Sequence, residues 1–424
     1  MKYIRRVVDE ELDELLPALP ALALEGPRAV GKTATASRRA RTQRRLDDPA
    51  QLEIVRADAR SILRGEPPIL VDEWQRAPST WDVVRRAVDE DATPGRFLLT
   101  GSAAPVRGPT HSGAGRIVTL RMRPMTLSER GLESPSVSLA RLLEGAGLPV
   151  DGRTEVRLAD YAREIVASGF PGLRDLSGRA LRAQLDSYLH RIVDVDFEQQ
   201  GHVVRDPASL RRWMAAFAAA TATTASYETI RDAATGGRGD KPARSTTLPY
   251  RETLEQLWIL DQVPAWIPSR NYFSRLGSAP KHHLVDPALA ARLLGVGEGA
   301  LVRGEQGRAP IPHGGGALLG RLFESLVTLC VRVYAQAAEA TVLHLRLRGG
   351  RHEVDLILER DDGRVLAIEV KLGGTVEEGD VEHLRWLEEQ LGGALLDAVV
   401  VNTGPGAYRR PDGIAVVPAA LLGP

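Results

Sequence analysis

The sequence predicts an α/β protein with a parallel-sheet domain first, a mainly helical middle and a second α/β domain last. Short β-rich runs alternate with helical stretches over residues 15–133, an order typical of a parallel sheet with crossover helices. Strand patterns are scarce over residues 153–270 and return after residue 317. A chain of 424 residues is long enough for several domains, each with its own core.

Changes of composition set the expected domain boundaries. A Ser/Pro/Gly-rich stretch over residues 133–152 interrupts the alternating pattern, and a Gly-rich stretch over residues 295–316 precedes the last part. The expected segments are residues 1–133 as the first domain, 134–205 as a linker and helical lid, 206–315 as a helical or winged-helix-like region, and 316–424 as the C-terminal domain.

Short apolar runs bounded by turn residues give the expected strands. In the first domain they are Ala21–Leu24, Gln43–Leu46, Ile69–Val71 and Phe97–Leu99, the last two apolar enough to be buried on both faces. In the middle, apolar residues at helical spacing predict helices at Leu181–Phe197, Leu210–Ala220 and Thr253–Leu260. In the last domain, with one helix before the first strand and another after the third, the expected strands are Thr341–Leu347, Glu353–Glu359, Val365–Lys371, Ala398–Asn402 and Ile414–Val417.

Composition excludes several classes of protein. Hydrophobic residues at 43% and charged residues at 26% are typical of a globular chain and exclude general disorder. The 55 basic and 55 acidic residues cancel, so net charge argues neither for nor against a nucleic-acid partner. The single cysteine, Cys330, lies in an apolar run and is expected to be a buried hydrophobe without a disulfide. No apolar run approaches about 18 residues and no signal-peptide pattern is found, so a cytoplasmic protein without a membrane span is expected.

A phosphate-binding loop follows the first strand. Gly26-Pro27-Arg28-Ala29-Val30-Gly31-Lys32-Thr33 fits the pattern G-x-x-x-x-G-K-[ST] and precedes the helix-compatible segment Ala34–Arg44. Glycines let the backbone wrap around a phosphate, whose charge the N–H groups and the helix N-terminus attract. Lys32 can reach the β- and γ-phosphates, and Thr33 can ligate Mg²⁺. A glycine-rich turn alone requires neither the lysine nor the hydroxyl, so the loop predicts a site for ATP and magnesium.

Two adjacent acids end a later apolar strand, Ile69-Leu70-Val71-Asp72-Glu73. With a P-loop upstream, this pattern predicts that Asp72 holds the magnesium or its water. Glu73 is placed to polarise an attacking water, a role that needs a carboxylate near the γ-phosphate. The alternative is a strand followed by a solvated turn.

Hydroxyls follow the strand Phe97–Leu99, at the sheet edge where α/β proteins place their ligands. Thr100 or Ser102 is expected to sense the γ-phosphate, although a hydroxyl that caps the turn explains the same letters. Arg116 is the candidate arginine finger, which stabilises transition-state charge, and a surface ion pair is its alternative.

Several motifs together resemble those of a known family. They are Gly-Pro-Arg-x-x-Gly-Lys-Thr at residues 26–33, Val-Asp-Glu-Trp-Gln-Arg-Ala-Pro at 71–78, Leu-Thr-Gly-Ser at 99–102, Arg-Pro-Met-Thr-Leu-Ser-Glu at 123–129 and Ser-Gly-Phe-Pro at 168–171. This set is similar to that of the bacterial and archaeal AAA-type ATPases that carry a C-terminal domain of unknown function. The resemblance spans nearly the whole chain. It implies a nucleotide-binding AAA domain, a helical or winged-helix middle and a restriction-endonuclease-like end. The chain departs from the pattern in the short, Gly/Pro-rich segment 103–115, which bears on Arg116, and at Trp74, where an aliphatic residue is more common.

Charged residues mark two neighbouring strands of the last domain. Asp355 precedes Glu369 by fourteen residues, and Lys371 follows in Glu-Val-Lys. Read as a hairpin, these strands let Asp355, Glu369 and Lys371 converge, and two carboxylates beside a lysine suit metal-dependent phosphodiester hydrolysis. The spacing resembles the Asp…Glu-x-Lys signature of restriction-endonuclease-like nucleases, and Glu324 matches the acid often found on their first helix. Residues 316–424 are therefore expected to be nuclease-like, unless these are solvated charges on an open hairpin face.

Three functions compete. The leading hypothesis is an ATPase that acts as a nucleotide-driven switch on DNA or another nucleic acid, and its first rival is a nucleotide-regulated DNA-binding or scaffold protein without cleavage activity. The middle of the chain carries basic residues for which two interpretations are open, a surface that contacts DNA or a solvated helix face. They are Arg231, Arg238, Lys241, Arg244 and Arg251. The third hypothesis is a P-loop kinase. It is disfavoured because a kinase must exclude water from its active site, whereas Glu73 is expected to activate water. An arginine finger acting from a second copy would require a homo-oligomer.

Overall fold

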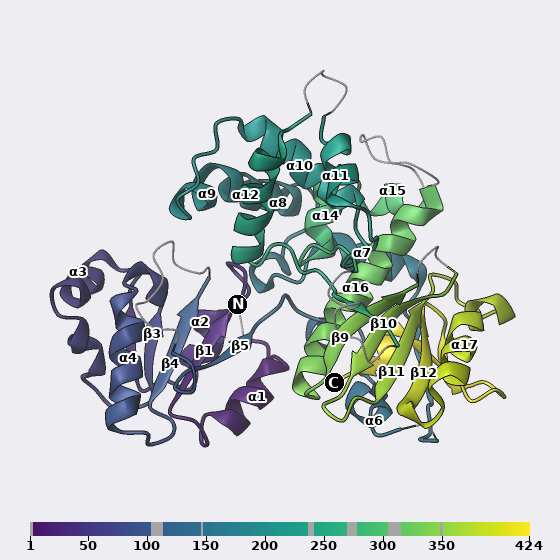
Figure 1. Cartoon of the computed structure of the whole chain (residues 1–424), viewed down its shortest axis with the longest axis horizontal. Helices are drawn as coiled ribbons and strands as arrows, with labels where there is room; N and C mark the ends of the chain where they lie inside the picture. Colours follow the sequence, from purple (N-terminus) through teal and green to yellow (C-terminus); the bar gives the residue numbers. More distant parts are fainter. Residues whose placement is uncertain are drawn as a thin grey trace.

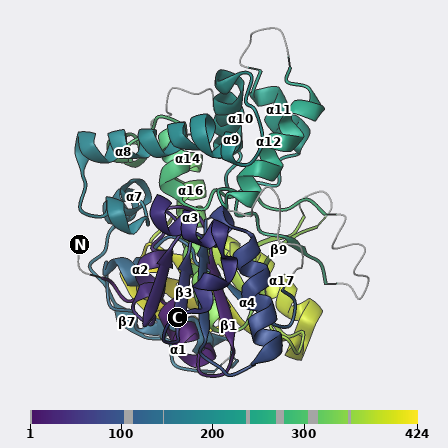
Figure 2. The ribbon, with the colours of Figure 1, turned by 90° about the vertical axis from the view of Figure 1, so that its left-hand side faces the viewer.

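The computed structural model describes residues 3–102, 113–145, 147–235, 241–268, 278–303, 315–347 and 351–424, with side chains described from residue 318 in the sixth segment. Figure 1 shows a first α/β domain in purple and blue, a helical middle in teal, and a second α/β domain in green and yellow. After a 90° turn the helical middle still lies on one side of both sheet domains (Figure 2). The predicted α/β fold class is confirmed.

The N-terminal domain is a parallel sheet of five strands in the order β2-β3-β4-β1-β5. The strands are β1 (Ala21–Glu25), β2 (Thr42–Arg45), β3 (Ile69–Asp72), β4 (Phe97–Gly101) and β5 (Val118–Arg121). The helices are α1 (Val8–Leu15), α2 (Lys32–Ser37), α3 (Pro49–Ala57) and α4 (Ser79–Glu90). As predicted, β3 and β4 are buried along their whole length. The edge strand β5 was not predicted, because its Val118 and Thr119 are exposed and give no buried-strand pattern.

The strand order explains how distant motifs meet. β4 lies between β1 and β3, with Thr100 paired in register with both Leu24 and Asp72. The carboxyl ends of these three parallel strands therefore share one edge, where open α/β sheets bind ligands. The helix after the phosphate loop is shorter than predicted: it ends at Ser37 because the chain turns into β2 at Thr42, whose N–H donates to the Pro68 carbonyl.

The middle of the chain is mainly helical, as predicted. Its helices are α7 (Leu158–Ala167), α8 (Gly178–Arg191), α9 (Phe197–Gln199), α10 (Pro207–Ala219), α11 (Tyr227–Ala233), α12 (Arg244–Gln256), α14 (Pro287–Leu293) and α15 (Glu298–Val302). The helix predicted over Leu181–Phe197 contains a π-helical turn, Ile192–Asp196, between α8 and α9. Such turns are rare and occur often at functional sites.

The C-terminal domain is an eight-stranded sheet in the order β7-β13-β14-β12-β11-β10-β9-β8. Its main elements are α16 (Gly315–Ala337), β9 (Thr341–Arg346), β10 (Glu353–Glu359), β11 (Val365–Val370), α17 (Glu382–Leu391), β12 (Leu395–Asn402), β13 (Gly406–Arg409) and β14 (Ala415–Pro418). The five predicted strands and two helices are present, and only the short β13 was missed among these. One face of the sheet packs in a cluster with α16 and the other with α17.

Earlier parts of the chain complete this sheet. β8 (Ala265–Trp266) comes from the helical middle, and β7 (Gly152–Arg153) comes from the stretch expected to be a linker. The same stretch holds β6 (Val137–Ser138), which pairs with β15 (Leu422–Gly423), and α6 (Leu139–Leu142). The stretch is therefore attached to the C-terminal domain at two places, through β7 at the edge of the eight-stranded sheet and through β6 beside β15.

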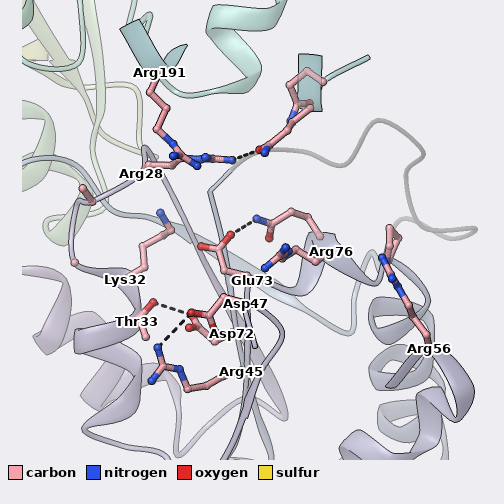
Figure 3. A pocket seen from close by; sticks show the side chains of 16 residues that line it. Arg28, Lys32, Thr33, Arg45, Asp47, Arg56, Asp72, Glu73, Arg76 and Arg191 are labelled. Carbon is pink, nitrogen blue, oxygen red and sulfur yellow. Dashed lines mark hydrogen bonds and ion pairs between the residues drawn. The ribbon is translucent and has the colours of Figure 1, made fainter. Parts of the chain in front are cut away.

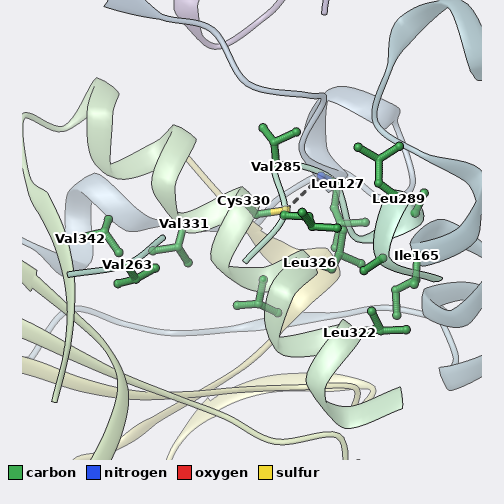
Figure 4. Packing of buried hydrophobic residues seen from close by; sticks show 14 of the residues in the cluster. Leu127, Ile165, Val263, Val285, Leu289, Leu322, Leu326, Cys330, Val331 and Val342 are labelled. Atoms are coloured by element: carbon green, nitrogen blue, oxygen red, sulfur yellow. Dashed lines mark hydrogen bonds between the residues drawn. The ribbon is translucent and has the colours of Figure 1, made fainter. Parts of the chain in front are cut away.

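One large apolar cluster joins the three parts of the chain, and two smaller clusters lie within the sheet domains. Figure 4 shows Leu127 of α5 (Leu127–Arg130) and Ile165 of α7 packed against Leu326 and Cys330 of α16. Cys330 is buried, its Sγ accepts the Leu127 N–H at 3.4 Å, and burial raises the pKa of its thiol to about 11. It is the buried hydrophobe that was predicted. Among the described helices, none is long and apolar enough to cross a membrane.

Candidate nucleotide site

The phosphate loop connects β1 to α2 through backbone conformations that favour glycine. Gly26 has a φ of +151°, and a Cβ there would lie 2.1 Å from the carbonyl oxygen of Met122. Gly31, at the start of α2, has a φ of +106°. A side chain would clash with the backbone at Gly26 and would be strained by the backbone conformation at Gly31, which explains the two glycines of the motif.

Lys32 crosses back over this loop. Its Nζ donates to the carbonyl oxygens of Gly26 and Pro27, both at 2.8 Å, and only 5% of the residue is exposed. Burial lowers the pKa of Lys32 to about 8, although the Glu73 and Asp72 carboxylates oppose the shift. An anionic phosphate in the loop would favour the charged ammonium in the same way.

Asp72 joins the loop to the neighbouring strands. Its Oδ1 accepts a hydrogen bond from Thr33 Oγ1 at 2.7 Å and another from the Thr100 hydroxyl. Thr33 and Asp72 are the two residues predicted to hold magnesium, and hydroxyl and carboxylate oxygens are ligands that this ion accepts. The donor set therefore fits Mg²⁺.

Glu73 follows Asp72 in a left-handed conformation, with a φ of 56°. Its Oε2 accepts hydrogen bonds from the Gln75 amide and from Ser102 Oγ, the latter at 3.2 Å. A non-glycine residue held at positive φ stores strain, which is found most often at functional sites. The two predicted sensor candidates therefore hydrogen-bond to different acids: Thr100 donates to Asp72, and Ser102 donates to Glu73.

A cavity of about 900 Å³ lies over these residues (Figure 3). Five arginines from separate elements line it. The sequence pattern indicated only the one in the phosphate loop, Arg28, as part of a nucleotide site. The five are Arg28 of the loop, Arg45 of β2, Arg56 of α3, Arg76 after β3 and Arg191 at the end of α8. Nothing in the local pattern distinguishes these arginines from surface ones, because only the fold brings them together. A cavity of this size lined by cations suits a polyanionic ligand.

The helical middle closes the cavity from above. Arg28 Nη1 lies 2.8 Å from Asp196 Oδ1 in the π-helical turn, and Arg28 Nη2 donates to Gln199 Oε1 at 2.6 Å. The hydroxyl of Tyr188 donates to the Arg28 carbonyl at 3.3 Å. Burial raises the pKa of Asp196, and Arg28 and Arg191 oppose that shift. Arg28 therefore joins the phosphate loop to the helical lid through both its side chain and its carbonyl group.

Arg116 does not line this cavity, so its role as an arginine finger stays a prediction that requires a second copy of the chain. Its Nε lies 2.7 Å from Asp89 Oδ1 on α4, where Arg85 also pairs with Asp89. Arg116 and Asp89 thus form a surface ion pair, which was the alternative to the arginine finger in the sequence analysis. The Gly/Pro-rich residues 103–112 before it lie outside the described residues.

Arg116→Ala is therefore expected to leave ATP hydrolysis unchanged at protein concentrations where the chain is monomeric. Arg191→Ala, which removes a cation from the cavity itself, is the matched comparison and is expected to weaken nucleotide binding. Steady-state phosphate release and nucleotide titration measure both. A larger loss in Arg116→Ala than in Arg191→Ala would contradict this assignment.

The predicted acids of the C-terminal domain do lie near one another. β10 and β11 form the expected antiparallel hairpin, and Asp355 Oδ2 accepts the Val370 N–H at 2.9 Å. Glu369 Oε1 lies 2.9 Å from Lys371 Nζ. Glu324 and Asp355, however, share a residue that the sequence analysis missed: Lys281 Nζ lies 2.8 Å from Glu324 Oε1 and 2.9 Å from Asp355 Oδ1.

The residues around Lys281 do not fit a divalent metal. A buried ammonium already occupies the point between the two carboxylates, and a cation beside it would meet like charge. In the part of the chain that the structure describes, no group of three or more His, Cys, Asp or Glu residues is arranged to hold a metal ion. The nuclease site predicted at Glu324, Asp355, Glu369 and Lys371 thus contains a buried lysine that the sequence pattern did not indicate.

Three family models match separate parts of the chain. Residues 19–130 match the family model of an AAA domain, and two domains of unknown function, DUF8612 and DUF4143, match residues 158–299 and 319–422. Two uncharacterized proteins, Rv2008c of Mycobacterium tuberculosis and Mb2031c of Mycobacterium bovis, are each 27% identical over 98% of this chain and 83% of their own length.

Two solved structures are also similar to this chain. The Walker-type ATPase PABY2304 of Pyrococcus abyssi aligns with a TM-score of 0.37 and 15% identity, over 67% of this chain and 94% of that one. The ORC2 protein of Aeropyrum pernix aligns with a TM-score of 0.29 and 16% identity, over 69% and 92%. The N-terminal domain thus resembles P-loop ATPases in its parallel sheet and phosphate loop, and it matches the AAA-domain model.

Proposed function

We propose that this chain binds ATP with magnesium, hydrolyses it, and uses the cycle to move the helical lid relative to the P-loop domain. The observation that carries the proposal is the cavity in which Lys32, the Thr33–Asp72 pair and Glu73 meet under the lid contact between Arg28 and Asp196. This combines a phosphate cradle, a magnesium donor set and a candidate general base in one place.

Each residue has a defined part in this proposal. Thr33 and Asp72 would hold magnesium, which neutralises phosphate charge when bound. Lys32 exchanges its two carbonyl acceptors for phosphate oxygens, a contact between full charges. Glu73 takes a proton from the attacking water, and its hydrogen bonds to Gln75 and Ser102 hold the carboxylate in place.

The first test is nucleotide binding and steady-state phosphate release with magnesium. Lys32→Ala is expected to lose both, because the loop loses its phosphate-binding charge. Lys241→Ala is the control, since Lys241 is a surface lysine paired with Glu228 and Asp232 and lies outside the cavity. Equal activity of Lys32→Ala and wild type would overturn the proposed ATPase.

The lid contact supplies the switch. Asp196 and a nucleotide phosphate would both attract the Arg28 guanidinium, whose Nη1 lies 2.8 Å from Asp196 Oδ1. ATP therefore competes with the lid for Arg28, and the differential contact that a population shift requires is provided by this one side chain.

Asp196→Asn tests this competition. Removing the competing carboxylate frees Arg28, so nucleotide affinity is expected to rise by about three- to ten-fold, or roughly 1 kcal/mol. Asp194→Asn, two residues away and paired with the exposed Arg211, is the matched control and is expected to leave affinity unchanged. Titration with a fluorescent ATP analogue measures both, and weaker binding by Asp196→Asn would show that the lid contact supports the nucleotide.

A second candidate function, nucleotide-regulated nucleic-acid binding without cleavage, is favoured by a separate cavity of about 280 Å³ in the helical middle. It is lined by Trp213, Tyr227 and three arginines, and the guanidinium of Arg251 lies 4.6 Å from the centre of the Tyr227 ring. Trp213 is buried, so Tyr227 is the aromatic residue of this cavity that could stack on a base of single-stranded nucleic acid. Stimulation of ATP hydrolysis by single-stranded DNA, lost in Arg251→Ala, would support this partner, and no binding of DNA by wild type would exclude it.

A further inference from the structure

The acid cluster of the C-terminal sheet is filled by a lysine from another part of the chain. Lys281 belongs to the helical middle, Glu324 to α16, and Asp355 to β10. The ammonium also lies 3.6 Å from Glu353 Oε1, and only 1% of Lys281 is exposed. Lysine is almost never fully buried without a paired acid, and Lys281 is surrounded by three acids.

The backbone holds this lysine in place. Lys281 and Val263 exchange both of their backbone hydrogen bonds, each at 2.9 Å. The next residue, His282, donates its N–H to Thr223 and accepts from Ala222. The ammonium cannot leave the acids by a side-chain rotation into solvent, because both the stem and the strand-like segment that carries it are buried.

Three bases partly balance the acids of the cluster without a metal. The acids are Glu324, Glu353, Asp355 and Glu369, and the bases that pair with them are Lys281, Lys371 and Arg346. Lys371 also lies 3.9 Å from a fifth acid, Asp380, so the acids exceed the bases by two. Burial and the neighbouring Asp355 raise the pKa of both Glu324 and Glu369 to about 8, which favours a proton on one of them near neutral pH.

We propose that Lys281 takes the place of a divalent cation in this cluster, so that the C-terminal domain has no metal-dependent cleavage activity and the cluster instead fastens the helical middle to the C-terminal sheet. The distances of 2.8 and 2.9 Å are those of charge-assisted hydrogen bonds to both carboxylates. The acids that resemble a nuclease site are thereby retained for an internal ion pair. This inference does not depend on ATP hydrolysis.

The experiment is a Mn²⁺ titration of the full chain without nucleotide, followed by electron paramagnetic resonance. Wild type and Asp355→Asn are expected to bind Mn²⁺ equally, because Asp355 is already occupied. Lys281→Ala is expected to gain a site with an affinity about ten-fold or more above any site of wild type, since two buried carboxylates lose their counter-charge. Lys281→Ala/Asp355→Asn is expected to lose that site again.

Lys241→Ala is the matched control, because Lys241 also lies between two carboxylates, Glu228 and Asp232, but at the surface. It is expected to gain no comparable site. Where Lys281→Ala does not fold, Lys281→Met keeps the buried stem and takes its place, and its melting temperature is expected to rise with Mn²⁺ while that of wild type does not.

Three results would overturn the proposal. The first is an Mn²⁺ site in wild type that Asp355→Asn removes, and the second is cleavage of single- or double-stranded DNA by wild type that the same change abolishes. The third is a folded Lys281 variant with no added Mn²⁺ binding. The comparison of wild type with Asp355→Asn decides the matter even if both Lys281 variants fail to fold.

Discussion

Glu73→Gln is expected to lower the rate of ATP hydrolysis by about a hundred- to ten-thousand-fold while nucleotide binding is retained, the range by which a positioned general base accelerates a reaction. Glutamine keeps the size of the side chain and can still hydrogen-bond to Ser102, but it cannot accept a proton from water. The loop residues that bind phosphate are untouched, so affinity for the nucleotide should be close to that of wild type.

Two measurements separate this effect from damage to the fold. Single-turnover phosphate release gives the chemical step, and titration with a fluorescent ATP analogue gives the affinity. Glu90→Gln, on the exposed end of α4 and paired only at 3.7 Å with Arg60, is the matched control and should hydrolyse ATP normally. If Glu73→Gln retained wild-type turnover, the general base would be another residue.

The positioning of Glu73 can be tested in the same assay. Ser102→Ala removes one of the two hydrogen bonds to Oε2 without changing charge. A smaller loss of turnover than in Glu73→Gln, with unchanged affinity, would show that Ser102 orients the carboxylate. A loss of affinity would instead place Ser102 on the nucleotide.

The residues of the candidate nucleotide site could be selected from the sequence because their pattern is local. A phosphate loop requires glycines, a lysine and a hydroxyl at fixed spacing, so Gly26–Thr33 can be recognised from its letters alone. The parallel sheet then brings Asp72 to Thr33, since β3 and β1 are both neighbours of β4. The helical middle and the C-terminal strands were also predicted from their periodicity.

Contacts between distant segments could not be predicted in this way. Asp196 lies in a π-helical turn that the periodicity presented as plain helix, and its partner Arg28 is 168 residues earlier. Lys281 lies on no long element, and a buried lysine has the same letter as an exposed one. The acids Glu324 and Asp355 were selected correctly as neighbours, but their counter-ion depends on the tertiary fold.

Asp261→Asn is expected to cause the largest loss of stability, about 3–5 kcal/mol, the cost of removing one partner from a buried ion pair. Asp261 lies in the helical middle, and its carboxylate is 2.8 Å from Arg123 Nε, 3.1 Å from Arg121 Nη1 and 3.0 Å from Arg332 Nη1. Two of these arginines belong to the P-loop domain side and the third to α16. Neutral asparagine would leave three guanidinium groups without their shared counter-charge.

The pH dependence of stability follows from the same cluster. The three arginines hold the pKa of Asp261 well below its usual range, although burial alone would raise it. A carboxyl whose folded pKa is depressed contributes stability above its unfolded pKa of about 3.9, and that contribution is lost as the pH falls toward the folded value. The difference in unfolding free energy between wild type and Asp261→Asn should therefore be full at pH 7 and shrink below about pH 4.

Urea unfolding at pH 7 and in acid measures this difference, and Asp194→Asn is the control. Asp194 pairs with Arg211 at the surface, where such pairs contribute at most about 1 kcal/mol. Because Asp261 contacts residues from both sheet domains, Asp261→Asn should also separate the unfolding transitions of these domains. We expect two transitions in the variant and one in wild type. A single transition with a midpoint equal to that of Asp194→Asn would mean that the apolar core alone, and not this charge cluster, holds the three parts of the chain together.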